Sequence, residues 1–460
     1  MSRHAKFALF VGLQVSWVLA AIYALGFLIV PDTALARALG LPVEAEAKLV
    51  NAHAFLQYAA ILALAFGIAW TTVDLRRPLA RALIAAGAVT QMFTCCGLLA
   101  LFGIYFSPFL PALAGVLAFA AGAYYARSGA GRRRDAVDAV FAGRVSPETA
   151  HALATSRVGA ADPVAATSLA EATHGHVREL TLVICEIFNH AALLDTLSAA
   201  DYLRLTNAFL DRAADALVRA GGCLVSCNGE GVTAFFGAPL PGQVHSHAVL
   251  GCRAALEVAR RVRALNESWH QEFDGEIATT FPGCDVRIGI NSGEMIAGRF
   301  GPAPGTLDTE TADAAALAGY GVAGDEVAFA RRLCAANLIY GSVALIGART
   351  YELAESAMEA RPLELLRRRV GGDWLEVYEL LGEPHELSET DQRRRELFWT
   401  GVIFFRERRL DEALDHFLNA RALDENSADG PLDFYIRRIE NLRQQDPSEE
   451  WETTRMLNAL

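Results

Sequence analysis

The sequence predicts three parts in order: an α-helical membrane domain with four spans, an α+β domain, and a short α-helical tail. Three observations predict this order. Four long apolar stretches near the N-terminus lack charged residues, helical and hairpin patterns alternate from about residue 180, and only helical patterns occur near the C-terminus. We therefore expect a membrane domain at 1–127, a linker with a short helix at 128–175, the α+β domain at 176–382 and the tail at 383–460.

Charge is divided unevenly along the chain. Residues 1–134 hold 11 Lys and Arg against four Asp and Glu, whereas the remaining residues hold 30 against 49. A cationic, apolar N-terminal part (the head, 1–134) followed by an acidic remainder (the body) excludes a collagenous or wholly disordered chain. It also disfavours nucleic acid as a partner, because an acidic body repels phosphate. The eight cysteines are scattered, so they do not form the framework of a disulfide-rich domain.

Four N-terminal stretches are long enough to cross a bilayer, which takes about 20 mostly apolar residues. They contain no Asp, Glu, Lys or Arg, and a charge at that depth would cost several kcal/mol. The first stretch is long and three more follow, so we expect a span there rather than a signal peptide. The four expected spans are Phe7–Val30, Ala52–Trp70, Ala82–Tyr105 and Pro108–Ala126.

The basic residues of the head predict its orientation. They gather at the N-terminus (Arg3, Lys6), in the second connection and after the fourth span (Arg132–Arg134). By the positive-inside rule, both termini and the α+β domain then face the cytoplasm of a bacterial inner membrane. The cysteines of the body are accordingly expected to be thiols.

Two polar or sulfur-bearing pairs in the membrane domain have competing interpretations. Cys95 and Cys96 could serve metal or lipid chemistry, but packing by small apolar side chains is favoured. His53 and Gln57 lie one helical turn apart and could face a ligand or haem, although a polar contact between helices is the simpler interpretation.

Two further pairs suggest metal ligands but are incomplete. The histidines of the range His174–His176 lack additional ligands nearby, so solvated side chains are favoured. Cys223 and Cys227 lie four residues apart on an expected strand and should share a face, where core packing is favoured. The chain also lacks the GxGxxG, GxxxxGK[ST] and GxSxG motifs, which counts against dinucleotide-binding, P-loop and α/β-hydrolase chemistry.

Helix and turn signals place the elements of the linker and body. Ser146 followed by Pro147 is typical of a helix start, so a short helix is expected near 147–155. Ser198 is an expected N-cap for a helix that ends at Gly221-Gly222. The other expected elements are strands Leu180–Ile187, Cys223–Cys227 and Val232–Phe236, the last two joined at Asn228-Gly229; helix His247–Leu265; a strand pair Val286–Ile290 and Glu294–Ala297 turning at Ser292-Gly293; helix Glu326–Ala336; and strands near 343–346 and 374–380.

The tail is helical over Glu396–Leu442, and its small and aromatic residues match the spacing of a tetratricopeptide-type helix pair. Such repeats bury their faces on neighbours, and only one is visible. A peptide-binding platform is one interpretation. A helical appendage packed on the preceding domain or its dimer mate is the favoured one.

Six segments of the body, taken together, resemble successive blocks of the class III adenylate/guanylate cyclase catalytic domain over roughly 176–382. The short helix near 147 and the segment Asn426–Leu442 are also similar to segments that flank bacterial members of this family. The six blocks are Val183–Ile187, Asn228–Pro239, Arg287–Gly298, Tyr320–Leu333, Ala335–Ile346 and Val377–Gly382.

The resemblance implies a reaction in which the 3′-hydroxyl of ATP or GTP attacks the α-phosphate and pyrophosphate leaves. It implies a site with two divalent metal ions, Mg²⁺ or Mn²⁺, held by carboxylates at Glu186 and Glu230. The base would be read from the positions of Ser226 and Gly321. The positions that bind the ribose and the transition-state charge, across a dimer interface, fall on Ala328 and Arg332.

Five of these six positions depart from the family's pattern, because only Arg332 is kept. Glu replaces Asp at both metal positions, which moves the carboxylate oxygens by about 1 Å in a site where Mg²⁺ demands near-ideal geometry. Ser226 and Gly321 replace a base-reading Lys and Asp, and no lysine follows Lys48. Ala328 replaces an Asn. Two segments also differ: the range Phe188–Ala191 replaces a Gly-Phe-Thr-like turn, and residues 301–319 are longer than usual.

We therefore expect a membrane-anchored class III cyclase-family protein in cyclic-nucleotide signalling, whose activity is weak or lost. It would act as a homodimer or as a heterodimer with another cyclase domain. The alternative is a non-catalytic, dimerising regulatory or nucleotide-binding module. A transporter or channel is disfavoured, because the expected spans carry no charged residue.

Overall fold

The computed structural model divides the chain into two compact units, Met1–Asp138 and Ala139–Leu460. Each unit is described by itself. The residues that the structure describes are 3–25, 29–41, 54–75, 78–127, 137, 140–141, 143–155, 175–239, 246–272, 281–301, 319–367, 374–424, 428–445 and 455–456.

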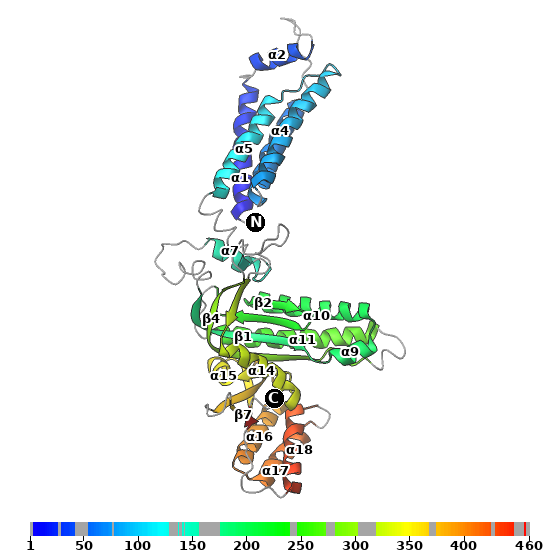
Figure 1. The fold of residues 1–460 in the computed structure, drawn as a ribbon, viewed down its shortest axis with the longest axis vertical. Helices are drawn as coiled ribbons and strands as arrows, with labels where there is room; N and C mark the ends of the chain where they lie inside the picture. Colours follow the sequence, from blue (N-terminus) through cyan, green and yellow to red (C-terminus); the bar gives the residue numbers. More distant parts are fainter. Residues whose placement is uncertain are drawn as a thin grey trace. The chain divides into compact units, whose positions relative to one another are not determined.

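Among its described residues, the first unit contains four helices long and apolar enough to cross a membrane (Figure 1). Large apolar side chains point outward from them, as on Trp17 and Leu83, which are 73% and 72% exposed. Such a surface suits lipid rather than water. The four helices are α1 (Arg3–Ala24), α3 (Ala54–Asp74), α4 (Pro78–Ala100) and α5 (Phe109–Arg127).

The first span is shorter than the sequence pattern predicts. Helix α1 ends at Ala24 instead of continuing to Val30, and a separate helix, α2 (Ile29–Ala38), follows. Pro31 is tolerated in the first turn of this new helix. Asp32, also in that turn, accepts a hydrogen bond of 2.8 Å from the Tyr105 hydroxyl, so its carboxylate has a polar partner outside the α1 span.

The polar and sulfur groups of this unit have packing roles. The side-chain amide of Gln57 hydrogen-bonds both backbone groups of Ser107, at 3.1 and 2.7 Å. Cys96 is buried in an apolar cluster with residues of α2 and with Tyr105. Both findings agree with the simpler interpretation of each pair, while His53 lies outside the described residues.

In the part of the second unit that the structure describes, nine strands form a mixed sheet with the order β2-β3-β1-β4-β6-β8-β7-β9, and β5 is paired to β4 (Figure 1). Strand β1 is central and antiparallel to both β3 and β4. The strands are β1 (His176–Ile187), β2 (Cys223–Asn228), β3 (Gly231–Phe236), β4 (Val286–Phe300), β5 (Gly319–Ala323), β6 (Ala344–Gly347), β7 (Glu359–Arg367), β8 (Trp374–Gly382) and β9 (Arg455–Met456).

Helices cover both faces of this sheet. Helices α10, α11 and α15 pack on one face, where Val183, Cys185 and Ile288 belong to a single large apolar core. Helix α14 packs on the other face, and the C-terminal helices extend the core there. The helices are α7 (Pro147–Thr155), α9 (His190–Thr196), α10 (Ala199–Arg219), α11 (Ser246–Glu272), α14 (Asp325–Tyr340), α15 (Ala348–Ala354), α16 (Glu389–Arg406), α17 (Leu410–Ala422) and α18 (Gly430–Gln445).

Local signals located several elements well. Helix α7 has the bounds expected from Ser146 and Pro147, and the Ser146 hydroxyl accepts from the Thr149 amide at 3.2 Å. The hydroxyl of Ser198 accepts from the amide of Asp201 at the start of α10. Just before α7, Arg144 pairs with the edge strand β2 through its backbone carbonyl and its guanidinium.

The turn predicted at Ser292-Gly293 is wrong, because β4 runs unbroken through it. Every residue of β1 has a partner on β4, and Thr181 lies opposite Ser292. The hydroxyls of these two residues are 2.7 Å apart and buried, and Ser292 also accepts from Thr350. Long antiparallel pairing and this buried hydrogen-bond network outweigh the local turn preference of Ser-Gly.

Cys223 and Cys227 lie on opposite faces of the sheet, against the prediction that they share one. The β2–β3 register passes from Leu224 opposite Ala234 to Ser226 opposite Thr233, which leaves Val225 as an extra residue. Such a bulge reverses the alternation of side chains beyond it. Cys223 is therefore buried and Cys227 exposed.

The C-terminal helices form one core with α14, β7 and β8. Phe398, Phe405, Phe417 and Tyr435 are fully buried there, together with Leu363 and other residues of the sheet. A close backbone contact adds to this: a Cβ at Gly430, which begins α18, would overlap the carbonyl of Gly341, which ends α14. The tail is thus packed on the α+β domain, as expected if it is a helical appendage of that domain.

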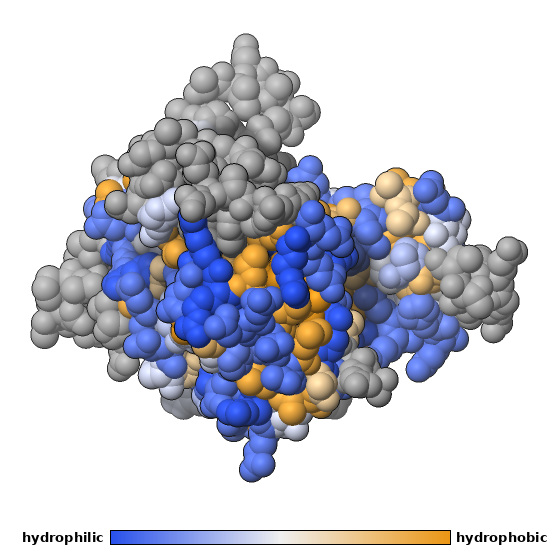
Figure 2. Space-filling view, turned by 90° about the horizontal axis from the view of Figure 1, so that it is seen from below, coloured by the Kyte–Doolittle hydropathy of each residue, from blue (hydrophilic) through white to orange (hydrophobic). Residues whose placement is uncertain are grey.

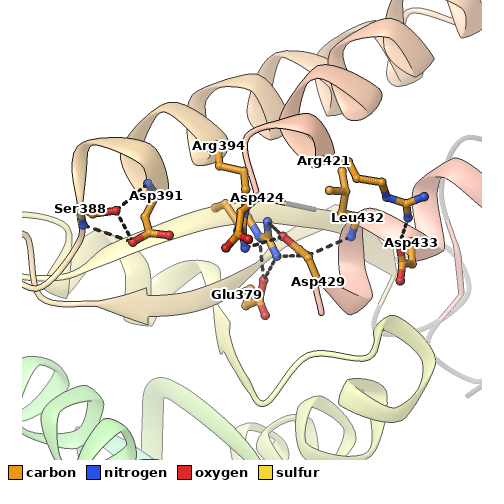
Figure 3. Close-up of polar contacts among 10 residues, drawn as sticks. Glu379, Ser388, Asp391, Arg394, Arg421, Asp424, Asp429, Leu432 and Asp433 are labelled. Atoms are coloured by element: carbon orange, nitrogen blue, oxygen red, sulfur yellow. Dashed lines mark hydrogen bonds and ion pairs between the residues drawn. The ribbon is translucent and has the colours of Figure 1, made fainter. Parts of the chain in front are cut away.

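Buried ion pairs also join the tail to the β7–β8 hairpin (Figure 3). Arg361 of β7 donates to both carboxylate oxygens of Asp429, at 2.8 and 2.6 Å, and to Glu379 at 2.7 Å. Arg394 of α16 contacts the same Asp429 carboxylate. Because these charges are paired, their burial is tolerated.

The outer surface of the tail remains mixed in character. Viewed from the end where α17 lies in Figure 1, Figure 2 shows apolar atoms between polar ones. Among the described residues of α16 and α17, Ile403 and Leu418 are exposed. Polar side chains such as Arg393 and Glu396, paired at 3.1 Å, are exposed on the same helix, α16, as Ile403.

Candidate functional site

Two glutamates meet where β1 ends and the β2–β3 hairpin turns. Glu186 lies opposite Gly231 in the β1–β3 register, and the Ile187 amide donates to the Glu230 carbonyl at 3.0 Å. The pairing of β1 with β3 therefore brings together two carboxylates that are 44 positions apart in the sequence.

The turn that carries Glu230 is held by the side chain of Asn228. Its Oδ1 accepts from the amides of Glu230 and Gly231, at 3.1 and 3.2 Å, in an Asx-type turn. At Gly231 the two strands come so close that a Cβ would overlap the carbonyl oxygen of Cys185. Asn228 and Gly231 thus fix where the Glu230 backbone sits beside β1.

Helix α14 lies against the same face of the sheet as Glu186. A Cβ at Gly289 of β4 would overlap the Ala330 carbonyl, so this glycine permits the close approach of the helix. The thiol of Cys334 contacts the carbonyls of Ile184 and Arg287 from the helix side. The approach places Arg331, which follows Ala330, beside the end of β1.

The bulge at Val225 determines which face Ser226 occupies. Beyond the bulge, Ser226 pairs with Thr233, and Thr233 pairs with Ile184 of β1. Partner residues of an antiparallel pair share a face, so Ser226 lies on the same side of the sheet as Glu186. A regular strand would have turned Ser226 to the side of α10 and α11.

These residues surround a pocket of about 420 Å³. It brings together three of the six positions singled out from the sequence: Glu186, Ser226 and Glu230. The lining residues are Glu186, Ile187, His190, Ser226, Asn228, Glu230, Gly231, Thr233 and Arg331.

The other three positions do not line the pocket. Gly321 of β5 is buried, and a Cβ there would lie 3.7 Å from Val225 Cγ1, next to Ser226 in the chain. Ala328 and Arg332 lie on α14, Ala328 exposed and Arg332 half-buried. The helix thus presents Arg331, and not Arg332, to the pocket of its own chain.

The charges of the pocket influence one another. Burial raises the pKa of the half-buried Glu186 carboxyl above its ordinary value, the positive charge of Arg331 opposes this rise, and the negative charge of Glu230 adds to it. Glu230 itself is exposed. The three charges are therefore close enough to interact across one small pocket.

The donor set fits a divalent cation. Two carboxylates face the same pocket and repel each other, and a cation between them relieves that repulsion. Within the described part of the chain, no group of three or more His, Cys, Asp or Glu side chains gathers. Glu186 and Glu230 are accordingly the protein groups that would hold Mg²⁺ or Mn²⁺, and phosphates or water would complete its coordination.

The segment after Glu186 is anchored by its side chains. Asn189 donates to the Gly283 carbonyl at 2.7 Å and accepts from the Asp285 amide at 2.9 Å. His190 begins α9 and its Nδ1 lies 2.8 Å from the Tyr202 hydroxyl. This segment stands where the resemblance implies a phosphate-wrapping turn. The rest of the segment expected to be longer, 302–318, and His174 lie outside the described residues.

Among the six lining residues that sequence reasoning did not single out are Arg331, His190 and Asn228. Asn228 carried a signal, because Asn-Gly predicted the turn whose backbone it holds. His190 follows Glu186 by four residues, within the segment that departs from the family's pattern. Arg331 had no signal of its own, because only the packing of α14 on Gly289 determines which of two adjacent arginines faces the pocket.

Comparisons with known proteins relate this domain to nucleotide cyclases. No family model matches the chain. A segment of 214 residues, 46% of the chain, is 23% identical to adenylate cyclase 1 of Rhizobium meliloti (strain 1021), and it spans only 29% of that protein. Among solved structures, adenylyl cyclase CyaB from P. aeruginosa is 21% identical over 46% of this chain and 99% of that one, with a TM-score of 0.38. Guanylyl cyclase Cya2 is also 21% identical, over 46% and 98%, with a TM-score of 0.37.

Proposed function

We propose that the chain is a membrane-anchored protein of the class III adenylate/guanylate cyclase type, which binds a nucleoside triphosphate and turns it over weakly. One observation carries the proposal: Glu186, Glu230 and Ser226 converge on a single pocket, at the positions that the resemblance assigns to metal and base. The similarity of 214 residues to a curated adenylate cyclase supports it.

The proposed reaction forms a bond between the substrate's 3′-oxygen and its α-phosphorus and breaks the bond to the β-phosphate, releasing pyrophosphate. A bound Mg²⁺ or Mn²⁺ would supply charge neutralisation on the phosphates and activation of the 3′-hydroxyl. Glu186 and Glu230 would hold that ion. Both side chains are longer than aspartate by one methylene, so their carboxylate oxygens would reach the ion from a shifted position, and turnover would be slow.

Recognition of the base is weak in this proposal. The Ser226 hydroxyl offers a single donor and acceptor, and Gly321 beside it offers no side chain. A missing hydrogen-bond partner reduces discrimination between substrates more than it reduces binding. We therefore infer that ATP and GTP are accepted with similar efficiency.

A second domain would complete the site. Ala328 and Arg332 lie on α14 but outside the pocket lining of their own chain, which agrees with a role across a dimer interface. Arg332 would contact the phosphates bound to the second copy, and Ala328 removes a polar contact worth about 1–4 kcal/mol in the transition state. The second copy would be this chain or another cyclase domain, held at the same inner membrane.

The test is cyclic-nucleotide formation by the full-length protein in detergent. We expect slow production of cyclic AMP and cyclic GMP, faster with Mn²⁺ than with Mg²⁺, because Mn²⁺ tolerates distorted coordination better. Restoring the family pattern should raise the rate, through the combined substitutions Glu186→Asp, Glu230→Asp, Ser226→Lys, Gly321→Asp and Ala328→Asn. Fast, nucleotide-strict turnover with Mg²⁺ in the unmodified chain would contradict these residue roles.

The alternative is a non-catalytic module that still binds nucleotide or dimerises. The loss of a polar side chain at Ala328, together with the Arg331 cation in the pocket, favours it. Nucleotide binding without any cyclic product, in the restored variant as well as in the unmodified chain, would establish this alternative instead.

A further inference from the structure

Arg331 is a charged lining residue of the pocket that the proposed function does not use. It follows Ala330, whose carbonyl lies against Gly289, so the sheet fixes the helix backbone at this point. Its side chain is exposed and lines the same pocket as both glutamates. Its charge acts on Glu186 within the same chain, in contrast to Arg332, which lies outside the lining.

The charge of the pocket differs from that of a site built for two metal ions. Glu186 and Glu230 together carry two negative charges when ionised, and the Arg331 guanidinium keeps one positive charge at any ordinary pH. A first divalent cation would make the pocket positive. In the absence of nucleotide, a second would bind against that charge, and in the described part of the chain no third His, Cys, Asp or Glu joins the two glutamates to hold it.

A guanidinium can take over one task of a metal ion. Its planar array of N–H donors binds phosphate oxygens in pairs, and its charge neutralises them. It cannot polarise a hydroxyl as a Lewis acid, which leaves that task to a single ion on the glutamates.

We propose that Arg331 stands in for the second metal ion, so that this pocket binds a nucleoside triphosphate with one divalent cation and with Arg331 on the phosphates of its own chain's nucleotide. This inference rests on the proposed function and specifies the phosphate recognition of that site. Without nucleotide, Arg331 balances the two carboxylates and keeps their affinity for cations low. With nucleotide, the same side chain turns to the phosphates.

The test uses the full-length protein in detergent and the variants Arg331→Gln and Arg331→Lys. Arg219→Gln, at the exposed end of α10 and paired with Asp215, is the matched control. Mn²⁺ binding is measured by electron paramagnetic resonance with and without a non-cyclisable ATP analogue, and binding of the analogue without metal is measured by calorimetry.

We expect the unmodified chain and the control to bind one Mn²⁺ per chain in the presence of the analogue. Arg331→Gln should bind Mn²⁺ alone about tenfold more tightly, because the repulsion between the guanidinium and the cation is lost. It should bind the metal-free analogue about tenfold more weakly, because the attraction between the guanidinium and the phosphates is lost. Arg331→Lys should lie between the two, since it keeps the charge and loses the paired donors.

The outcomes separate the two proposals. If Arg331→Gln and the unmodified chain bind Mn²⁺ and the analogue alike, or if the unmodified chain binds two Mn²⁺ with the analogue, the role of Arg331 is wrong while nucleotide binding stands. If no variant binds the analogue with or without Mn²⁺, the proposed function fails and the role of Arg331 fails with it.

Discussion

Single residues in the β2–β3 hairpin determine whether the two carboxylates can meet. A Cβ atom at Gly231 would overlap the backbone carbonyl of Cys185, because β1 runs directly beside this residue. Gly229, two residues earlier in the same turn, has open space around its Cα. The two glycines therefore differ in the contact they permit, although both belong to one turn.

Gly231→Ala should destabilise the protein by about 1–3 kcal/mol, because the new methyl group must push β3 away from the Cys185 carbonyl. Gly229→Ala should change stability by no more than about 0.5 kcal/mol. Urea denaturation of the detergent-solubilised protein, followed by tryptophan fluorescence, measures both. Equal stability of the two variants would show that the strands are not in close contact at Gly231.

The candidate site was predictable in part from single residues. Glu186 and Glu230 were found through the family resemblance, and the structure places both on one pocket. The face of Ser226 depends on the bulge at Val225, which strand patterns do not reveal because a bulge adds one ordinary residue. Arg331 was missed because the rotation of α14 depends on its contact with Gly289, which is a tertiary effect.

Among the elements, α17 shows how strongly the tail is tied to the domain. Phe417 is fully buried and stacks on Tyr435 of α18 with ring centroids 5.1 Å apart, whereas its neighbour Leu418 is 45% exposed. The two side chains are adjacent in the sequence and opposite in environment, so they form a matched pair for testing the shared core.

Phe417→Ala should destabilise the second unit by about 3–5 kcal/mol, because it removes a large side chain from a packed core and leaves a cavity. Leu418→Ala should cost less than about 1 kcal/mol, since much of its surface already faces water. Limited proteolysis and thermal melting measure the change in stability of both variants. Cleavage of the tail alone, with the α+β domain left at full stability, would contradict a shared core.

One buried carboxylate, that of Asp429, joins the start of α18 to the β7–β8 hairpin through Arg361. Burial alone would raise the pKa of Asp429, but the hydrogen bonds and charge of Arg361 outweigh it and lower the pKa below its ordinary value of 3.8. A lowered pKa in the folded state stabilises the fold above the ordinary value, and this stabilisation is lost as the pH falls below it.

Asp429→Asn should lower the free energy of unfolding by about 3–5 kcal/mol near neutral pH, because Arg361 is left buried with one fewer charged partner. The asparagine oxygen can still accept from the Leu432 amide, so the start of α18 keeps its cap. The difference from the unmodified chain should shrink as the pH falls from about 5 to 3. Asp433→Asn, whose partner Arg421 is exposed, should cost less than about 1 kcal/mol at any pH.

Helices with clear capping residues were predicted from the sequence. Strands β5 and β7, which form through pairing with distant strands, were not predicted. The caps at Ser146 and Ser198 gave two helix starts correctly. Strands β5 and β7 escaped notice because they carry little regular alternation, and β7 contains buried charges such as Glu364, which pairs with Arg438 of the tail at 2.7 Å. A charge whose partner lies 74 positions away looks like a surface residue in the sequence.

For the whole molecule, the proposed function requires two copies of the cyclase-type domain. We expect the full-length protein to be a dimer at micromolar concentration in detergent, because the membrane spans raise the local concentration of the domain and its site needs residues from a partner. Light scattering measures the mass. A strictly monomeric protein under these conditions would rule out the homodimer and leave only a different cyclase domain as partner.

The same proposal fixes the side of the membrane. The clusters of Lys and Arg flanking the four apolar helices predict both ends in the cytoplasm, where nucleoside triphosphates are found. A reporter enzyme fused after Leu460 should be active only on the cytoplasmic side. Activity on the outer side would reverse the predicted topology and separate the pocket from its substrate.

Helix α14 packs on two sides. One side lies on the sheet beside the pocket, and the other is covered by the tail helices. During synthesis α14 leaves the ribosome before α16–α18 do. Until about residue 439 has emerged, the apolar side of α14 that Phe398 and Tyr435 later cover is open to solvent. The helix that brings Arg331 to the pocket therefore has its second side covered only once α16–α18 have been made, and a chain released before them would leave that side of α14 uncovered.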